Sequence, residues 1–226
     1  MTWIDDTCDA LERYFVANAD PERAEPMASY MRDQFAFYGI GAKDRSDILK
    51  TVWAEHALPT EAAELADFVD ACLARPQREW HYTAVAAMRK QGRHLRGDSW
   101  DTVCAIATTH AWWDTIDELA KHIAGRIVKN DPTQVTVMDE WVRSDDMWVA
   151  RVAILHQLGY KDTTDVERLF GYCDLRADET DFFYRKAIGW ALRQYAYVDA
   201  AAVQSYVDSR RDRLSPLSVR EALKNL

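Results

Sequence analysis

The sequence contains few of the residues that interrupt regular structure. Only 8 glycines and 6 prolines occur in 226 residues, and neither a P-loop nor a GxGxxG motif is present. That absence argues against a fold that holds nucleotide phosphates in a glycine-rich loop. The four cysteines form no CxxC pair, and the six histidines show no metal-ligand spacing. We therefore expect reduced thiols, no metal site and no cofactor.

Long hydrophobic runs are also missing. No stretch approaches the roughly 18 apolar residues of a membrane-spanning helix, and the first residues lack the pattern of a signal peptide. We expect a cytoplasmic protein with no membrane segment. The net charge is −9, and residues 1–75 carry most of it, with 15 acidic against 7 basic side chains. This balance argues against general affinity for nucleic acid, but it leaves open a basic groove on an acidic body.

Helical periodicity is what the sequence has in abundance. Apolar residues recur three and four positions apart along the chain, and start signals such as Asp20-Pro21 are frequent. Capping boxes are predicted at Thr164–Glu167 and Ser218–Glu221. We predict an all-α protein. The expected helices span residues 3–18, 21–35, 44–56, 60–74, 76–92, 98–109, 112–129, 132–143, 146–158, 165–174, 179–196, 199–211 and 216–225.

Aromatic residues repeat along the chain with a spacing close to 34. Trp80, Trp113, Trp148 and Phe182 follow this spacing, and the pattern around the last two is W-x-x-R-x-A-I and F-x-x-R-x-A-I. Paired helices that repeat in this way form an α-solenoid, whose inner helices line a concave surface. We predict one curved domain over residues 1–226. A compact helical bundle is the alternative.

The segment WWDTIDEL, which begins at Trp112, is the most unusual in the sequence. On a helix, Trp113, Asp117 and Lys121 share one stripe, while Trp112 falls on the core stripe. An aromatic face beside a carboxylate at a groove edge suits the stabilisation of a cation. The structural alternative is a core tryptophan pair with a solvated aspartate.

Two further groups of residues are candidates for binding. Arg151 is the only charged side chain within residues 147–158, so it requires an anion, either a carboxylate of a neighbouring helix or a phosphate. Lys186, Trp190 and Arg193 share one helix face, and this alternation of cations and an aromatic suits a nucleic-acid backbone. From the spacing alone, an amphipathic helix with extended cationic side chains is the preferred explanation of the second pattern.

Six short segments spread over nearly the whole chain form an ordered set. They are AEPMASYM (24–31), FYGI (37–40), REW (78–80), WWDxxD (112–117), WxxR (148–151) and KAIGWxxR (186–193). Together they resemble the DNA alkylation repair enzyme family, the AlkD-like alkylpurine DNA glycosylases built from HEAT-like repeats.

The resemblance implies a monofunctional glycosylase that removes N3- and N7-alkylated purines from duplex DNA. The duplex would lie in the concave groove, and the lesion would not be flipped into a base pocket, unlike in most such enzymes. By position, Asp117 is the implied catalytic carboxylate, and Trp113 and Trp190 are the aromatic walls beside the deoxyribose. Arg151 is implied to clamp the DNA backbone. The other implied DNA contacts are Tyr30, Arg45, Phe182, Phe183, Lys186 and Arg193.

These residue types suit the implied chemistry. An alkylated purine is cationic and leaves as a neutral base, while positive charge develops on the sugar beside the carboxylate. No lysine on the segment lies closer to Asp117 than Lys121, so we expect no lyase step. We expect a monomer with alkylated duplex DNA as its partner. A non-catalytic helical scaffold that binds protein or structured DNA is the alternative, because one fold can serve both roles.

Overall fold

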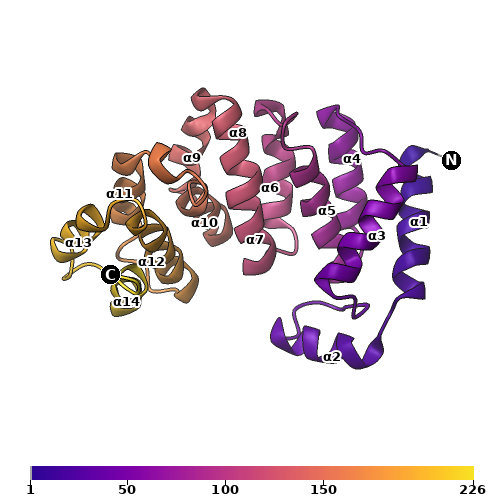
Figure 1. Ribbon diagram of the computed structural model, residues 1–226, viewed down its shortest axis with the longest axis horizontal. Helices are drawn as coiled ribbons and strands as arrows, with labels where there is room; N and C mark the ends of the chain where they lie inside the picture. Colours follow the sequence, from indigo (N-terminus) through magenta and orange to yellow (C-terminus); the bar gives the residue numbers. More distant parts are fainter. Residues whose placement is uncertain (1) are drawn as a thin grey trace. The chain divides into compact units, whose positions relative to one another are not determined.

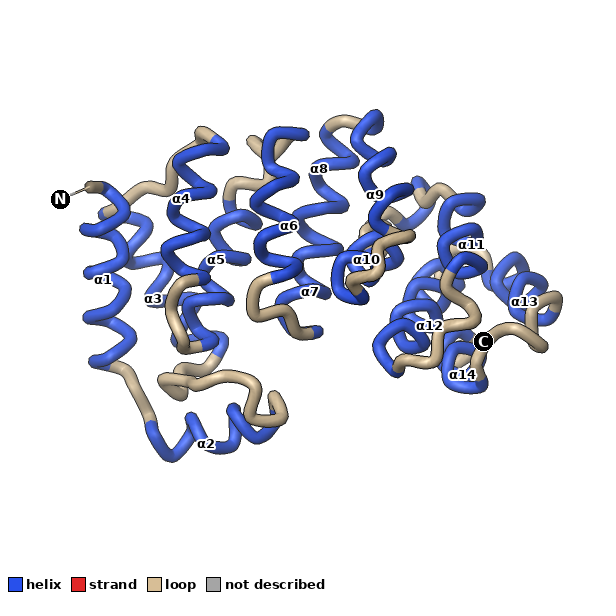
Figure 2. The backbone as a smooth tube through the Cα atoms, turned by 180° about the vertical axis from the view of Figure 1, so that it is seen from behind, coloured by secondary structure: helices blue, strands red, loops and turns tan. Residues whose placement is uncertain are grey.

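The computed structural model describes residues 2–226, and it confirms the all-α prediction. These residues form fourteen α-helices and no β-strand (Figures 1 and 2). Within residues 2–226 no helix combines the length and apolar character needed to cross a bilayer. The chain divides into two compact units, Met1–His110 and Ala111–Leu226. The single domain over residues 1–226 stays a prediction.

The N-terminal unit is a layer of packed helices. It contains α1 (Trp3–Ala17), α2 (Pro21–Tyr30), α3 (Ala42–Glu55), α4 (Ala62–Leu73), α5 (Arg78–Lys90), the short turn η1 (Gly97–Ser99) and α6 (Trp100–Thr108). Helix α4 packs against α1, α5 and α6, whereas α2 lies apart from this layer at one end of it (Figures 1 and 2). Phe15, Phe68 and Trp80 are fully buried between these helices.

Helix α2 is shorter than the expected helix 21–35, because it ends at Tyr30. Arg32 and Asp33 both have a φ of 56°, in the left-handed region, which a right-handed helix cannot continue through. The N–H of Asp33 donates to the carbonyl of Ala28 at 2.8 Å and closes the helix end. The sequence has no glycine at this point, so the usual signal for such an end is missing.

A buried carboxylate fixes the loop that follows α2. Glu79 has no exposed surface, and it accepts hydrogen bonds from the three backbone N–H groups of residues 38–40 at 3.0–3.1 Å. Gly39 has a φ of +89°, and a Cβ there would lie 2.0 Å from the carbonyl oxygen of Asp20. Glu79 of the REW segment therefore holds the backbone of the FYGI segment in place.

The C-terminal unit begins with one continuous helix and continues with shorter ones. It contains α7 (Trp113–Leu119), the π-helical turn η2 (Ala120–Ala124), α8 (Gly125–Asn130), η3 (Pro132–Gln134), α9 (Val135–Trp141), α10 (Met147–Leu155), η4 (Lys161–Thr163), α11 (Val166–Leu175), α12 (Phe182–Ala196), α13 (Ala200–Asp208) and α14 (Pro216–Ala222). Helix α10 packs against α7, η2 and α12, and α12 packs against α14 (Figure 1). Helix α10 thus connects the helix of Asp117 with that of Trp190.

The two predicted capping boxes are wrong. Helix α11 is capped by the Asp165 side chain and α14 by the Ser215 side chain, so neither Thr164–Glu167 nor Ser218–Glu221 forms a box. Aspartate is a stronger N-cap than threonine, and Pro216 at the first helical position fixes where α14 starts. Glu221 is therefore free to face another helix.

Long-range hydrogen bonds in the C-terminal unit follow the predicted repeat spacing. The Tyr160 hydroxyl donates to the carbonyl of Gly125, 35 residues earlier, at 2.7 Å. The Arg176 Nε donates to the carbonyl of Val142, 34 residues earlier, at 2.6 Å. Residues 34 or 35 positions apart in the sequence are thus in contact at these two places. The curved solenoid itself stays a prediction.

Candidate active site

The helix of the WWDTIDEL segment starts one residue later than expected. Trp112 has an extended backbone (φ −156°, ψ 159°), and α7 begins at Trp113. Ile116 and Leu119 are fully buried, whereas the Asp117 side chain is 18% exposed at the edge of the core. Trp113 and Asp117 lie one turn apart on the same stripe of α7.

Asp117 is bound by Arg151 of α10. Its Oδ1 accepts a hydrogen bond from Nε at 2.8 Å, and its Oδ2 accepts one from Nη2 at 3.1 Å. The Nη1 of Arg151 donates to the carbonyl of Phe183 at 2.6 Å, and only 5% of the Arg151 side chain is exposed. The anion that Arg151 binds in this structure is therefore a carboxylate of a neighbouring helix.

The environment of Asp117 disfavours its charged form. Burial raises the pKa of this carboxyl above its usual value, and the neighbouring charges of Asp114 and Glu118 act in the same direction. The charge and hydrogen bonds of Arg151 oppose that rise. Carboxylates with perturbed pKa values are frequent at functional sites, and structural ion pairs also produce them. The two hydrogen bonds fix the orientation of the carboxylate.

Three aromatic rings pack beside this ion pair. The ring centroids of Trp112, Trp148 and Phe183 lie 4.8–5.6 Å apart. Phe182 contacts Phe183 at 5.4 Å and is 52% exposed. The sequence assigned Trp112 to packing but did not predict this cluster. The sequence did contain a signal for this cluster, because Trp148 follows Trp112 by 36 residues and Phe183 follows Trp148 by 35, close to the repeat spacing.

The two cations predicted beside Trp190 share one carboxylate. Glu221 of α14 binds Lys186 at 3.1 Å and Arg193 at 2.9 Å. A Cβ on Gly189 would lie 2.5 Å from the Cβ of Glu221, so this glycine allows α14 to approach α12 closely. Burial works against the charged form of Glu221, yet its pKa is lowered by the hydrogen bond and charges of the two cations. The sequence did not predict this role for Glu221.

The remaining predicted DNA contacts, Tyr30 and Arg45, lie in the N-terminal unit. Tyr30 is the last residue of α2 and is 71% exposed. Arg45 belongs to α3, and its guanidinium lies 4.2 Å from the centre of the Tyr82 ring. Arg45 is half-buried, whereas Tyr30 is exposed. Their contact with DNA stays a prediction.

Comparison with known proteins identifies the family. A sequence profile described as DNA alkylation repair enzyme matches residues 11–226. The chain belongs to the DNA alkylation repair enzyme family. The structure of a protein described as a predicted DNA alkylation repair enzyme from Enterococcus faecalis is similar to it, with a TM-score of 0.82 and 30% sequence identity. That similarity covers 92% of this chain and 96% of the other. A search of curated proteins finds no match.

Family membership makes the chain an enzyme of DNA repair that acts on alkylation damage, with DNA as its partner. The C-terminal unit of this repair enzyme brings together Asp117, Arg151 and the three packed rings. Residues 2–226 contain no group of three or more histidine, cysteine or acidic side chains arranged to hold a metal.

Proposed function

We propose that this repair enzyme is a monofunctional DNA glycosylase, which hydrolyses the N-glycosidic bond of positively charged N3- and N7-alkylpurines in duplex DNA. The observation that supports this best is the Asp117 carboxylate, which is 18% exposed and held by two hydrogen bonds on a packed helix. A fixed charge of this kind stabilises a transition state without having to reorganise. Membership of the DNA alkylation repair enzyme family supports alkylated DNA as the substrate.

The reaction requires a negative charge beside the sugar but no acid beside the base. Alkylation makes the purine cationic, so it leaves as a neutral molecule. Positive charge then develops on the deoxyribose, as in glycoside hydrolysis. Asp117 stabilises that charge and orients the water that attacks C1′. A carboxylate has about four lone-pair positions, and Arg151 occupies two of them, so acceptor positions remain for the water.

Arg151 weakens the electrostatic effect of Asp117 without abolishing it. A carboxylate about 4 Å from the sugar contributes about 4 kcal/mol at an effective dielectric constant of about 20. A guanidinium behind it, about 8 Å from the sugar, opposes this by about 2 kcal/mol. The net of about 2 kcal/mol corresponds to a rate factor of about 30. If Arg151 moves to a backbone phosphate, the factor rises toward about a thousand.

The proposed DNA clamp by Arg151 therefore requires a movement. Three of the five N–H groups of its guanidinium are used by Asp117 and Phe183. The side chain is 5% exposed, so the guanidinium must leave this position to contact a phosphate. Arg151 would then exchange the Asp117 carboxylate for a DNA phosphate and remain paired with an anion. The electric field of Asp117 at the sugar would become stronger, because the guanidinium would no longer oppose it.

The remaining parts of the proposal concern how DNA is held. Trp113 and Trp190 form walls beside the deoxyribose, where each aromatic face contributes on the order of 1 kcal/mol toward a cation. The helices form HEAT-like repeats of an α-solenoid, and the duplex lies in the concave groove that they line. The base is not flipped into a pocket, because its own positive charge provides the selectivity. The other DNA contacts are Tyr30, Arg45, Phe182, Phe183, Lys186 and Arg193.

A non-catalytic scaffold that binds protein or structured DNA is a second candidate. The observation that favours it is that Arg151, Lys186 and Arg193 are all bound to carboxylates of the chain itself. Such pairs are also what a purely structural helical repeat requires. The proposal of a glycosylase rests instead on the combination of Trp113, Asp117, Arg151 and Trp190, which a scaffold has no reason to combine.

Incubation with methylated duplex DNA tests the proposal. The wild-type protein should release free 7-methylguanine and 3-methyladenine, detected by liquid chromatography and mass spectrometry, and should leave intact abasic strands. Unmethylated duplex is the control and should yield no free guanine or adenine. Release no faster than from DNA alone would favour the scaffold. Strand breaks formed together with the abasic site would contradict a monofunctional enzyme.

A further inference from the structure

A basic pocket lies along the same helix as Asp117. Its volume is about 410 Å³, and it lies between the η2–α8 part of the helix and the turn after α10. Lys121, Arg126 and Lys129 line it from the helix, and Lys161 lines it from the turn. Lys121 is four residues beyond Asp117, so the pocket begins about 6 Å further along the helix axis.

The lysine and arginine side chains of this pocket have no carboxylate partner in residues 2–226, whereas His122, which also lines it, lies 3.8 Å from Glu118. All four cationic side chains are exposed, and none of them makes an ion pair with another residue in 2–226. No carboxylate lines the pocket. Eight other cations of the C-terminal unit are bound to carboxylates, whereas Arg143 and Arg185 donate to backbone carbonyls. The eight are Arg151, Arg168, Arg176, Lys186, Arg193, Arg210, Arg211 and Arg213. Four like charges in one pocket repel each other, and a bound anion removes that repulsion.

Direct contacts hold the walls of the pocket in place. The Tyr160 hydroxyl donates to the Gly125 carbonyl at 2.7 Å, and the Lys129 Nζ lies 4.5 Å from the centre of the Tyr160 ring. A Cβ on Gly125 would lie 2.3 Å from the carbonyl oxygen of His156, so the helix and the end of α10 are in backbone contact. The π-helical turn η2 is part of this wall, and such turns are frequent at functional sites.

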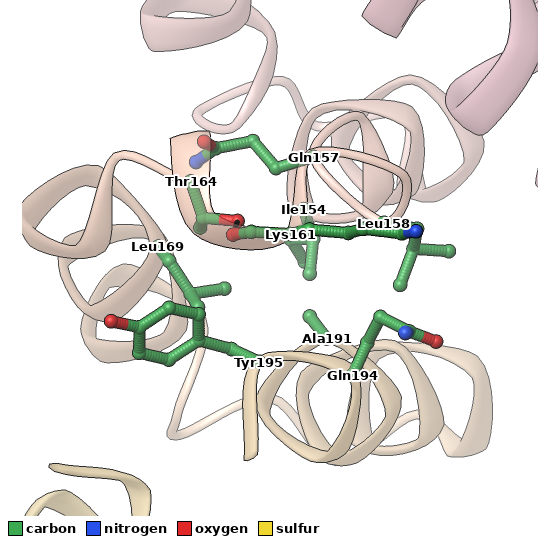
Figure 3. A pocket seen from close by; sticks show the side chains of 9 residues that line it. All are labelled: Ile154, Gln157, Leu158, Lys161, Thr164, Leu169, Ala191, Gln194 and Tyr195. Carbon is green, nitrogen blue, oxygen red and sulfur yellow. Dashed lines mark hydrogen bonds between the residues drawn. The ribbon is translucent and has the colours of Figure 1, made fainter. Parts of the chain in front are cut away.

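An apolar gap between α10 and α12 adjoins the pocket. Figure 3 shows Ile154 and Leu158 facing Ala191 across this gap, with the side chains of Lys161 and Gln194 ending on the same side. Lys161 and Gln194 line both spaces. The gap has a volume of about 10 Å³, which leaves room for no more than a water molecule. A ligand is therefore confined to the basic pocket.

The ligand chemistry that fits the pocket is phosphate. Ammonium and guanidinium groups bind phosphate oxygens through charge-assisted hydrogen bonds. A volume of about 410 Å³ is typical of pockets for organic ligands, so a phosphodiester with its sugars fits as well as a single ion. We propose that this pocket binds backbone phosphates of the DNA strand that passes Asp117, away from the lesion itself. The choice of strand rests on the proposed function, and a free phosphate ion has the same chemistry.

Binding to an undamaged duplex tests the backbone assignment. The variant Lys129→Gln/Lys161→Gln removes two uncompensated charges from the pocket. The control Arg210→Gln/Arg213→Gln removes the same charge from side chains that are paired with carboxylates. Fluorescence anisotropy over a range of salt concentrations gives the slope of log K against log[salt]. We expect the pocket variant to reduce this slope by about 2, since each lost phosphate contact accounts for about 0.9, and the control to leave it within about 0.5.

A titration with inorganic phosphate separates the two sources of the ligand. Amide spectra report whether Gly159 and Tyr160 respond, since both line the pocket. A reduced salt slope of DNA binding in the pocket variant supports the proposal whether or not inorganic phosphate also binds. A saturable response to phosphate with an unchanged slope would assign the pocket to a free anion and overturn the backbone assignment. An unchanged slope without any response would overturn the site altogether.

These measurements are independent of base excision, because they use undamaged DNA. A reduced slope in a protein that releases no methylated base would support the pocket and contradict the glycosylase. Normal release of methylated bases with an unchanged slope would contradict the pocket alone. Failure of this inference is thus distinguishable from failure of the proposed function.

Discussion

Replacement of Arg151 by methionine tests whether the ion pair with Asp117 supports the fold as well as the site. The variant keeps the aliphatic stem but leaves the Asp117 carboxylate, which is only 18% exposed, without its cation. Loss of one partner of a fully buried pair costs about 3–5 kcal/mol, and partial exposure reduces this to about 2–3 kcal/mol. The Phe183 carbonyl also loses a donor, which adds about 1 kcal/mol. We expect the free energy of unfolding to fall by about 3–4 kcal/mol at pH 7.

The loss in the Arg151→Met variant should depend on pH. Burial already raises the pKa of Asp117, and removal of Arg151 raises it further because the opposing charge and hydrogen bonds are gone. A carboxyl group whose pKa is raised in the folded state favours folding below its unfolded pKa, and this contribution is lost as pH rises through the folded pKa. The destabilisation of the variant relative to wild type is therefore largest near neutral pH and shrinks toward pH 4.

Urea unfolding monitored by tryptophan fluorescence at pH 7 and pH 4.5 measures both effects. The double variant Asp117→Asn/Arg151→Met should lose less than the single variant, since no uncompensated charge remains. The control is Arg168→Met, whose partner Asp139 is 36% exposed, and it should lose about 1 kcal/mol or less. A loss below about 1 kcal/mol in Arg151→Met, or a loss equal at both pH values, would refute the reasoning.

Three further predictions concern catalysis, DNA binding and packing. The rate of base release should fall as pH drops through the raised pKa of Asp117. A pH–rate profile whose acidic side gives an apparent pKa at or below that of an ordinary aspartate would contradict this role. Glu221→Gln frees two cations for phosphate, so the salt slope of DNA binding should steepen by about 1–2, and an unchanged slope would count against this. Gly125→Ala places a Cβ 2.3 Å from the His156 carbonyl oxygen and should destabilise the protein by more than about 2 kcal/mol in urea unfolding. Gly171→Ala, with nothing within 4 Å, is the control; equal effects of the two substitutions would show that the close contact is unimportant.

The helices were predictable because their signals are local. Apolar periodicity and caps such as Asp20, whose side chain accepts hydrogen bonds from the start of α2, depend only on neighbouring residues. The end of α2 was not predictable, since Arg32 and Asp33 adopt a left-handed conformation with no glycine to signal it. The N-cap of α11 was misassigned because two adjacent residues, Thr164 and Asp165, could each serve as a cap. The N-cap of α14 was misassigned because Pro216 fixes the start of that helix three residues earlier than expected from the Ser218–Glu221 pattern.

The candidate site was predictable in its positions but not in its pairings. The helical stripe of Trp113 and Asp117 follows from their spacing alone, and the need of Arg151 for an anion follows from its apolar surroundings. Which anion Arg151 binds depends on how α7 and α10 pack against each other. The spacing of residues along the chain does not predict that packing. The binding of Lys186 by Glu221 likewise depends on the close approach of α14 to α12.

The most direct test of the account is the rate at which Asp117→Asn releases 7-methylguanine under single-turnover conditions at pH 7. Asp139→Asn is the matched control, because it disrupts a similar bidentate pair with Arg168 elsewhere in the same unit. Asp117→Asn removes the full carboxylate contribution of about 4 kcal/mol and leaves Arg151, so it should be slower than wild type by about a thousandfold, with unchanged circular dichroism. The control should remain within about threefold. Release by Asp117→Asn within about threefold of wild type would contradict the claim that this carboxylate stabilises the sugar cation.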